Sequence, residues 1–328
     1  MTTSTRRQNA VLLTSELVCI GGAAINRKYH AKAALIAGTS NPATGHITFG
    51  GVARNVAETL ARLGATVTLV SLVGEDEAGR AILHHLHALG VDVGHIAVAP
   101  TSATAEYTAI LNEAGDLHIA MAAMDAFEAI TPAVLESAWP HIAASGWMFA
   151  DCNLPQDTLH ALLNRKMGAE TRLAVNTVSV PKAVRLPKNL SAIDVLFTNA
   201  DEARAILGGT SQAPESLTAG LRERGAVSVV LTLGAQGHLV HDDTGTHQVR
   251  ALDAHIVDVT GAGDALMSGT LYGLMMGQSL VDASRLGAVL ATFTLESEQD
   301  VLPDLNPAWL AAQTDRLARI TSRKLPAL

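Results

Sequence analysis

The chain has 328 residues, of which 48% are hydrophobic and only 3% aromatic, and its formal net charge is −8. This length is enough for one large α/β domain or two smaller ones. The negative charge argues against nucleic acid as a partner, and no apolar run approaches the roughly 18 residues of a membrane span.

The start of the chain shows no secretion signal. Residues 1–18 contain two arginines and a short apolar stretch, but no long apolar core and no small-residue cleavage site. The two cysteines, Cys19 and Cys152, lie in apolar contexts and are expected to be reduced. We therefore expect a cytoplasmic protein that does not associate with membranes.

Strands and helices alternate in the first part of the chain. Residues 16–23 form a short apolar run that predicts a buried strand. Residues 52–64 carry apolar side chains at helical spacing and end in a glycine, and residues 78–91 repeat that pattern. A second apolar strand is predicted between these helices, over residues 66–74.

Two segments break this alternation. Residues 24–50 contain no good helix, and residues 101–123 resemble a hairpin that turns at "NEAGD". We expect both segments to form a small β lid outside the main sheet. The main α/β domain then comprises residues 1–23, 51–100 and 124–328.

The alternation of strands and helices resumes after the second segment. Strand-like runs such as "GWMFADCN", "AIDVLFTN" and "SVVLTLGAQG" are separated by amphipathic helical runs. This order favours an α/β fold in which helices cover a mostly parallel sheet.

The stretch "DVTGAGDA", residues 258–265, carries the clearest chemical signal. The residues before it, "AHIVDV", are strand-like, and those after it predict a helix with Ala265, Gly269 and Gly273 on one smooth ridge. Residues 261–263 would then lie at a helix N-terminus. Free N–H groups and the positive end of the helix dipole at that point favour an anion.

Asp264 follows this anion site directly and would lie in the first helical turn. A carboxylate there can accept the proton of an attacking hydroxyl while the amides stabilise a transferred phosphoryl group. The sequence contains neither a P-loop nor a G-x-G-x-x-G motif after its first strand. We therefore expect a phosphotransferase whose fold is neither of the P-loop class nor of the dinucleotide-binding class.

Four motifs together resemble the ribokinase, or PfkB, family of carbohydrate kinases. They are "DVTGAGDA", "FGGVARNVAETLARLG" at 49–64, "TNADE" at 198–202 and "TLGAQG" at 232–237, and they occur in the family's order. The resemblance implies a ribokinase-like three-layer sandwich with a mostly parallel central sheet and a small β lid. It also implies ATP as donor, Mg²⁺ as cofactor and a small sugar or nucleoside as substrate.

The resemblance assigns roles residue by residue. Asp264 matches the catalytic base, and Glu202 matches a residue that holds Mg²⁺ through water. The other matches are the anion hole at Gly261, Ala262 and Gly263, the ribose positions Gly50, Gly51 and Asn55, the nucleotide positions Asn199, Thr232, Gly234 and Gly237 together with Gly261 and Gly263, and a possible monovalent cation (K⁺) site at Asp258 and Thr260.

Within the family, residues 38–64, 150–159 and 175–183 resemble the pseudouridine kinases, which phosphorylate the 5′-hydroxyl of pseudouridine. Ser40 and Asn41 either contact this substrate or only form a turn before Pro42, and the resemblance favours contact. Thr104, at the start of the second lid segment, is a similar candidate.

Two departures from the family pattern leave other functions open. Asn26 and Asn176 stand where relatives carry Asp, and Asn26 would bind the sugar without a charge-assisted acceptor. One alternative is a kinase for another sugar or nucleoside, such as ribose, inosine or adenosine. A second is a non-catalytic sensor of sugars or nucleotides, although the intact Asp264 argues against it.

Three further features bear on substrate contact, metal binding and oligomeric state. Lys28, in the lid, either touches the substrate or only forms a hinge contact. His84, His85, His87 and His95 cluster in the sequence and are interpreted as a solvated helix face rather than a metal site. The apolar lid strands would be exposed in a monomer, so we expect a homodimer that forms through the lid.

Overall fold

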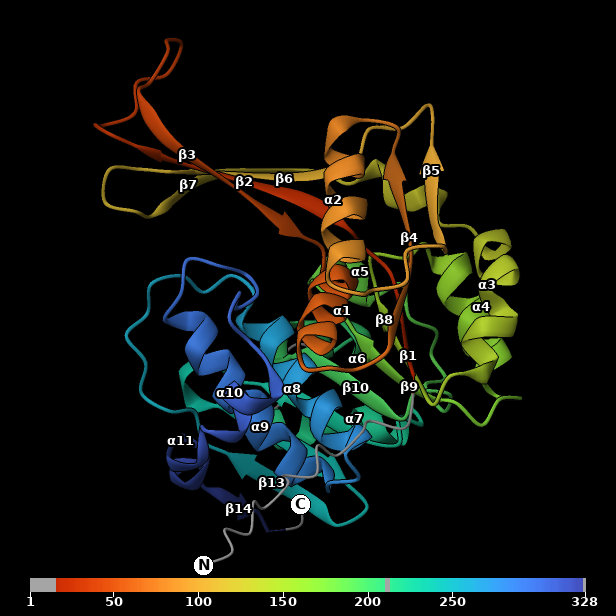
Figure 1. Ribbon diagram of the computed structural model, residues 1–328. Helices are drawn as coiled ribbons and strands as arrows, with labels where there is room; N and C mark the ends of the chain where they lie inside the picture. The colour runs from red at the N-terminus through yellow and green to blue at the C-terminus, as the bar shows by residue number, and fades with distance from the viewer. Residues whose placement is uncertain (1–15, 210–212, 327–328) are drawn as a thin grey trace, which may run out of the picture.

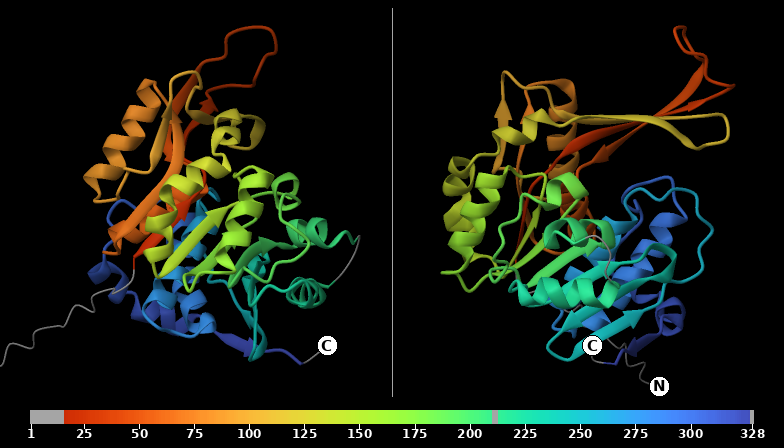
Figure 2. Two further views of the ribbon diagram at one scale, coloured as in Figure 1. Left: turned by 90° about the vertical axis from the view of Figure 1, so that its right-hand side faces the viewer. Right: turned by 180° about the vertical axis from the view of Figure 1, so that it is seen from behind.

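The computed structural model describes residues 16–209 and 213–326 and contains two β-sheets (Figures 1 and 2). The large sheet has ten strands in the order β14-β13-β12-β11-β10-β9-β8-β1-β4-β5, and the small sheet has four in the order β3-β2-β6-β7. The small sheet projects from one end of the molecule, as Figure 1 shows.

Seven neighbouring strands of the large sheet are parallel, which confirms the predicted α/β class. They are β1 (Leu17–Ile20), β4 (Val67–Gly74), β5 (Ile96–Ala99), β8 (Trp147–Asp151), β9 (Arg172–Asn176), β10 (Val195–Asn199) and β11 (Val229–Thr232). Three antiparallel strands continue the sheet beyond β11. They are β12 (His238–Asp242), β13 (Gly245–Val249) and β14 (Ser322–Lys324).

Helices cover both faces of the large sheet, so the fold is a three-layer sandwich. One layer contains α1 (Val52–Arg62), α2 (Glu77–Ala88), α8 (Ala262–Met275), α9 (Leu280–Leu295), α10 (Pro307–Ala311) and α11 (Thr314–Arg319). The other contains α3 (Pro132–Ala144), α4 (Gln156–Lys166), α5 (Val180–Ala183), α6 (Ala200–Leu207), α7 (Pro214–Glu223) and the 3₁₀ turn η1 (Asp125–Ala129). A second 3₁₀ turn, η2 (Gly234–Gln236), follows β11.

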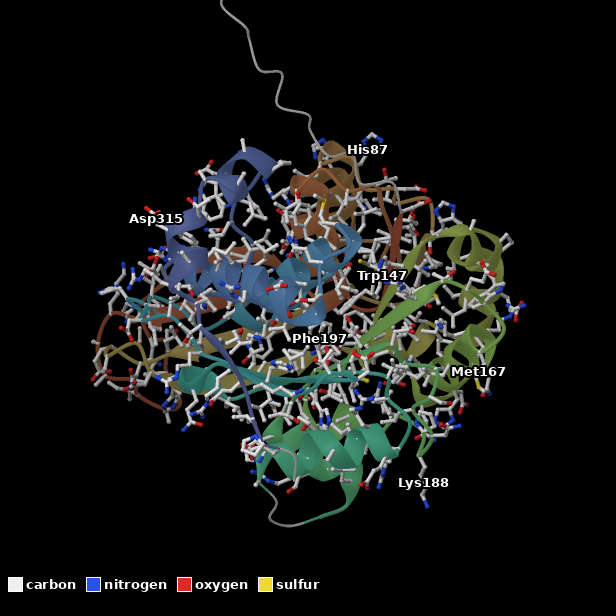
Figure 3. The ribbon with its side chains drawn as sticks, turned by 90° about the horizontal axis from the view of Figure 1, so that it is seen from below. His87, Trp147, Met167, Lys188, Phe197 and Asp315 are labelled. Atoms are coloured by element: carbon white, nitrogen blue, oxygen red, sulfur yellow. The ribbon has the colours of Figure 1, made fainter. Side chains whose placement is uncertain are left out.

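Alternation along the strands creates two separate hydrophobic cores. In β1, Leu17 and Cys19 pack toward α1 and α8, whereas Val18 and Ile20 pack toward the opposite helical layer. Phe197 lies near the centre of the molecule in Figure 3, while Met167 lies at its rim. Both Cys19 and Cys152 are buried free thiols.

Helices α8 and α9 pack unusually closely, as the predicted small-residue ridge requires. A Cβ atom on Gly269 would lie 2.6 Å from the Cα of Gly287, and one on Gly273 would lie 2.7 Å from the Cα of Ala283. Side chains at either glycine would force the helices apart. This contact fixes the position of α8 and therefore of its N-terminus.

The small sheet is built from the two segments that interrupt the alternation. Its strands are β2 (Ala24–Ala31), β3 (Ala43–Gly50), β6 (Ala105–Leu111) and β7 (Leu117–Ala123). β2 lies inside the sheet, antiparallel to β3 and parallel to β6, and β7 forms an edge whose residues are all exposed.

The strand expected immediately before "TGAGD" is absent, and this prediction was wrong. Residues 250–259 form an irregular segment in which Ile256, Val257 and Val259 are exposed. The sheet position beside β13, which a strand following β13 would occupy in a hairpin, is taken by β14. The segment instead lies beside the C-terminal end of α9, where the Val257 N–H donates to the Leu295 carbonyl at 2.7 Å.

No helix in the described part of the chain is both long enough and apolar enough to cross a bilayer.

Candidate active site

The site is built at the carboxyl ends of β1 and β8, where the buried carboxylate of Asp151 connects three segments. It accepts hydrogen bonds from the backbone N–H groups of Gly22 at 3.0 Å, Ala53 at 2.8 Å and Asn153 at 3.0 Å. Burial raises the pKa of Asp151, and these three donors oppose the shift. The carboxylate therefore joins the glycine turn after β1 to the first turn of α1.

The paired glycines at the start of α1 are required by the chain's own packing. Gly51 has a φ of 94°, and a Cβ there would lie 2.4 Å from the Gly22 carbonyl oxygen. A Cβ on Gly50 would lie 2.3 Å from Oδ1 of Asn26. Glycine at position 51 thus lets the two backbones meet, whereas a side chain at position 50 would displace the Asn26 amide.

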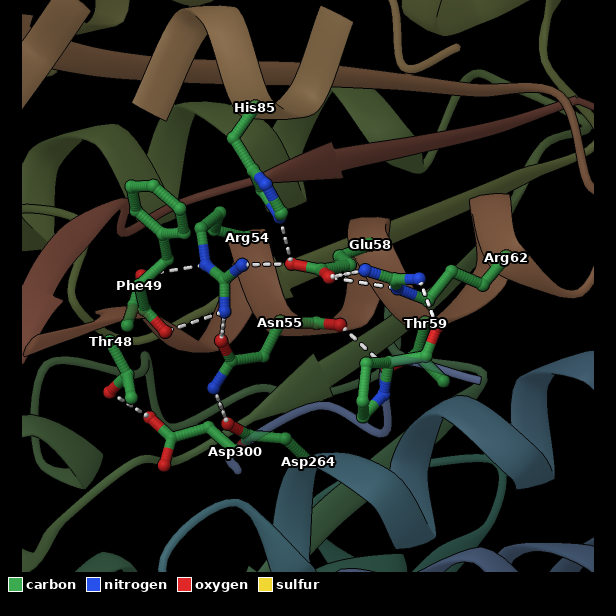
Figure 4. Close-up of polar contacts among 12 residues, drawn as sticks. Thr48, Phe49, Arg54, Asn55, Glu58, Thr59, Arg62, His85, Asp264 and Asp300 are labelled. Carbon is green, nitrogen blue, oxygen red and sulfur yellow. Dashed lines mark hydrogen bonds and ion pairs between the residues drawn. The ribbon is translucent and has the colours of Figure 1, made fainter. Parts of the chain in front are cut away.

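Asp264 lies in the first turn of α8, opposite the first turns of α1. The Nδ2 group of Asn55 donates to its Oδ2 at 2.6 Å, as Figure 4 shows. Burial raises the pKa of Asp264 to about 7, against the Asn55 hydrogen bond, and the nearby charges of Asp300 and Asp151 raise it further. A carboxyl group with this pKa can exchange a proton near neutral pH.

The residues before Asp264 form the expected helix entry. Gly261 is the N-cap of α8 with a φ of 79°, and a Cβ there would lie 2.4 Å from the Asp300 carbonyl oxygen. A Cβ on Gly263 would meet no heavy atom within 4 Å, so this face of the turn is open. The first N–H groups of a helix lack acceptors within it, so residues 262–264 present amide donors beside the Asp264 carboxylate.

A hydrogen-bonded chain of side chains runs from the surface of α2 to Asp264 (Figure 4). Arg54 is almost fully buried, donates to the side chains of Glu58 and Asn55, and binds the Gly50 carbonyl at 3.0 Å. Since Arg54 occupies the Asn55 oxygen, the Asn55 amide nitrogen must face Asp264. Arg54 therefore fixes which donor Asp264 receives.

Glu58 compensates the buried charge of Arg54. Burial alone would raise the pKa of Glu58, but Arg54, Arg62 and His85 outweigh it and hold that pKa below its usual value. Nε2 of His85 lies 2.9 Å from Oε2 of Glu58, and the imidazole stacks on Phe49. At least one histidine of the predicted solvated face thus belongs to this buried network.

Asp258 and Thr260 organise the turn that enters α8. Oδ1 of Asp258 accepts from the Thr260 N–H at 2.9 Å and from its hydroxyl at 2.8 Å. The other oxygen of Asp258 is ion-paired with Lys28 of β2. Lys28 therefore links the small sheet to the turn that enters α8.

Asn199 and Glu202 form a capping box at the start of α6. The Asn199 side chain accepts from the Glu202 N–H at 2.9 Å, and Oε2 of Glu202 accepts from the Asn199 N–H at 3.1 Å. Nδ2 of Asn199 also donates to Oε1 of Glu202 at 2.7 Å, and Thr177 donates to Oε2. The N-x-x-E motif thus has a structural role that sequence reasoning did not assign.

The nucleotide-side loop follows β11 as its motif predicts. The Thr232 hydroxyl lies 3.4 Å from the Thr198 carbonyl oxygen, a weak contact. Gly234 and Gly237 have φ angles of 57° and 89°, and a Cβ on Gly237 would lie 2.1 Å from the Val249 carbonyl oxygen. Asn176, one of the two Asp-to-Asn departures, accepts from the Val178 N–H at 2.9 Å in a neighbouring turn.

Three candidate substrate residues are not brought to Asp264. Ser40 and Asn41 lie in the far loop between β2 and β3, where the exposed Asn41 side chain bonds the backbone of Ile36 and Thr39. The Thr104 hydroxyl accepts from the Gly74 N–H at 2.9 Å and donates to Asp76 at 2.6 Å. Thr104 therefore has a structural role, and Asn41 closes its own turn.

Sequence reasoning missed four buried charged residues, Arg54, Glu58, Asp151 and Asp300. Arg54 lies in a quoted motif, and its pairing with Glu58 four residues later was a readable signal. Asp151 ends an apolar strand, where ligand crevices form in α/β sheets. Asp300 follows α9 in a segment with no motif, and Nδ2 of Asn26 donates to it at 2.6 Å.

Residues 14–306 match the model of the pfkB family carbohydrate kinases, and the chain belongs to this family of ATP-dependent phosphotransferases. It is 30% identical over 296 residues to the pseudouridine kinase of Escherichia coli K12, an alignment that covers 89% of this chain and 94% of that protein.

Solved structures agree with the family assignment. A carbohydrate kinase from Agrobacterium tumefaciens superposes with a TM-score of 0.82 at 32% identity, covering 94% of this chain and all of that one. The ribokinase of Arabidopsis thaliana, complexed with ribose and ATP, superposes with a TM-score of 0.79 at 19% identity, covering 92% of this chain and 98% of that one. The fold is therefore ribokinase-like.

The buried network predicts how Arg54 tunes Asp264. Replacing Arg54 with Met removes a positive charge and frees the Asn55 oxygen, so the pKa of Asp264 should rise above about 7. The pKa can be measured by an NMR titration of ¹³C-labelled aspartate carboxyl groups. Arg62→Met is the matched control, because Arg62 shares Glu58 but is not bonded to Asn55. Equal Asp264 pKa values in both variants would contradict the role of Arg54.

Proposed function

We propose that this protein transfers the γ-phosphoryl group of ATP to the 5′-hydroxyl of a ribosyl substrate, with pseudouridine as the preferred acceptor. The observation that carries the proposal is the Asp264 carboxylate, which Asn55 holds at 2.6 Å beside the open N-terminus of α8. A proton acceptor and a set of amide donors thereby share one helical turn.

The two parts of this turn would act on different atoms. Asp264 accepts the proton of the substrate hydroxyl as its oxygen attacks the γ-phosphorus. The amides of residues 261–263, with the positive end of the helix dipole, stabilise the negative charge that develops on the phosphoryl oxygens. The bond to the ADP oxygen breaks, and Asp264 later releases its proton to solvent.

The metal is expected to enter with the nucleotide. Within the described ranges, no group of three or more His, Cys, Asp or Glu side chains is placed to hold a metal ion. Both oxygens of Glu202 already accept hydrogen bonds, which fits a contact to Mg²⁺ through water rather than a direct bond. Bound Mg²⁺ would neutralise charge on the nucleotide phosphates, near the loop that carries Thr232, Gly234 and Gly237.

A K⁺ site at Asp258 and Thr260 does not fit this arrangement. Thr260 occupies one oxygen of Asp258, and the ammonium group of Lys28 occupies the other. The chain's own cation therefore stands at the one carboxylate of that turn. We propose that turnover requires no added K⁺.

Support for pseudouridine comes from the 30% identity with the Escherichia coli pseudouridine kinase over most of both chains. Ribose or another nucleoside is the second candidate, favoured by the amide at Asn26 and by its bond to Asp300. In either case we propose that the small sheet closes as a lid over the acceptor, in the cytoplasm, where ATP is available. Contacts of Ser40 and Asn41 with the acceptor require such a movement.

We also propose that a second copy of the chain covers the apolar face of β7. Leu117, Ile119 and Met121 alternate along this strand and are each at least half exposed. Ile119 and Met121 lie two residues apart and share one face of the sheet, whereas a register shift next to Leu117 interrupts the alternation there.

Substrate preference is tested by assaying a panel of pseudouridine, uridine, ribose, inosine and adenosine with ATP and Mg²⁺. We expect the highest kcat/KM with pseudouridine, and equal rates when K⁺ is replaced by tetramethylammonium. A higher kcat/KM with another acceptor would overturn only the pseudouridine assignment. If no acceptor of the panel is phosphorylated, the proposed kinase activity itself is overturned.

Removal of the base is tested by Asp264→Asn. We expect phosphoryl transfer to fall by at least about 1000-fold, while calorimetry shows nearly normal binding of the acceptor. Asp282→Asn, in the exposed first turn of α9, is the control and should keep full activity. A folded Asp264→Asn variant with unchanged turnover would disprove the role.

The proposed dimer is tested by sedimentation. The wild-type protein should sediment at twice the monomer mass, and Ile119→Lys should shift it to the monomer, because the charge would be buried without a partner. Glu113→Lys, in the exposed turn before β7, should leave the dimer intact. A wild-type protein that is monomeric at micromolar concentration would refute the proposal.

A further inference from the structure

Asp300 is a buried carboxylate to which no role has so far been assigned. It follows α9 in an irregular segment, and only 6% of its surface is exposed. Burial raises its pKa, against the hydrogen bond from Asn26 and the positive charges of Arg54 and Lys28. Burying a carboxylate is unfavourable unless its oxygens are bonded, so its position needs a reason.

Only one of its two oxygens has partners in the described part of the chain. Oδ2 accepts from Nδ2 of Asn26 at 2.6 Å and more weakly from the Thr48 hydroxyl at 3.5 Å. Asn26 and Thr48 are directly paired positions of β2 and β3, so both donors come from the base of the small sheet. Among the described residues, no side chain or backbone N–H donates to Oδ1.

The two nearest positive charges are already committed elsewhere. Arg54 donates to Glu58, Asn55 and the backbone, and Lys28 is paired with Asp258. Both attract Asp300 electrostatically without a hydrogen bond to it. The second oxygen of Asp300 is thus held in place but left free to accept a donor from outside the chain.

The Asp300 residue lies beside the reacting groups. The Asp300 backbone packs against Gly261, and the charge of Asp300 raises the pKa of Asp264. Figure 4 shows the two carboxylates close together below Asn55. A molecule whose hydroxyl faces Asp264 would therefore present its neighbouring groups to Asp300.

We propose that Asp300 binds the substrate by accepting a hydrogen bond from a ring hydroxyl of the ribosyl group. Asn26 and Thr48 are positioning residues that fix the orientation of the Asp300 carboxylate from the small sheet. This inference rests on the proposed function and deepens it. It also gives the amide at position 26 a purpose, because an amide can donate to Asp300 whereas a second carboxylate would repel it.

The first test is the steady-state kinetics of Asp300→Asn with the best acceptor of the substrate panel. Loss of a charge-assisted acceptor should raise KM by about 10- to 100-fold and change kcat much less, because the bond is present before and during the reaction. Asp304→Asn is the matched control in the same segment, and its exposed side chain should leave KM unchanged. A folded Asp300→Asn variant with wild-type KM would overturn the proposal.

A swap separates binding from folding. Asn26→Asp alone places two carboxylates together and should also raise KM. The double variant Asn26→Asp/Asp300→Asn keeps one carboxylate and one amide with their order reversed. Its KM should be at least about tenfold lower than that of Asp300→Asn. If Asp300→Asn does not fold, the folded double variant is compared with wild type instead. A KM about 100-fold higher than the wild-type value would then refute the proposal.

A third readout would not respond to a merely structural role. Wild type should use 2′-deoxy or 3′-deoxy analogues of its acceptor poorly, and Asp300→Asn should lose most of this discrimination against one of them. Unchanged discrimination against both analogues would reject Asp300 as the hydroxyl acceptor. Wild-type turnover on the panel tests the proposed function separately, because every Asp300 result is a ratio to wild type on the best acceptor found.

Discussion

The candidate site depends on one buried carboxylate, that of Asp151. Its two oxygens accept three backbone hydrogen bonds, which tie the end of β8 to the turn after β1 and to the start of α1. Together with the hydrogen bond from the Arg54 N–H to the Gly22 carbonyl at 3.1 Å, they hold the Gly22 and Gly51 backbones in contact. Because Asn55 lies one turn further along α1, its reach to Asp264 also depends on this anchor. The raised pKa of Asp151 shows that burial opposes its ionisation at this position.

Opposing electrostatic influences set the protonation of Asp264. Burial and two neighbouring carboxylates favour the neutral acid, whereas the Asn55 amide and the Arg54 charge favour the anion. The resulting pKa of about 7 lies in the range useful to a general base, since the group must be deprotonated before reaction and must hold a proton afterwards. An exposed aspartate would be ionised but too weak a base. A fully buried aspartate without partners would stay protonated.

The sequence predicted those parts of the site that depend on local structure. Glycines at 50, 51, 261 and 237 and the helix entry at Asp264 are readable because turns and caps leave short patterns. Asp300 left no such pattern, because its partner Asn26 is 274 residues away and only the tertiary fold brings them together. The strand expected at 254–259 failed for a related reason. Its β-branched residues have strand propensity, but β14, from the end of the chain, occupies the pairing edge.

The attachment of the small sheet has a mechanical consequence. Three of its strands leave the large domain at neighbouring points, because Ala24 of β2 is paired with both Gly50 of β3 and Ala105 of β6. If the sheet turns about these points, displacement grows in proportion to distance along β2. At about 3.3 Å per residue, Asn26 lies about 7 Å from this pivot and Ala31 about 23 Å. A swing that carries the far loop by several ångströms therefore moves Asn26 by less than a third as much as Ala31, so the sheet behaves as a lever whose short arm stays at Asp300.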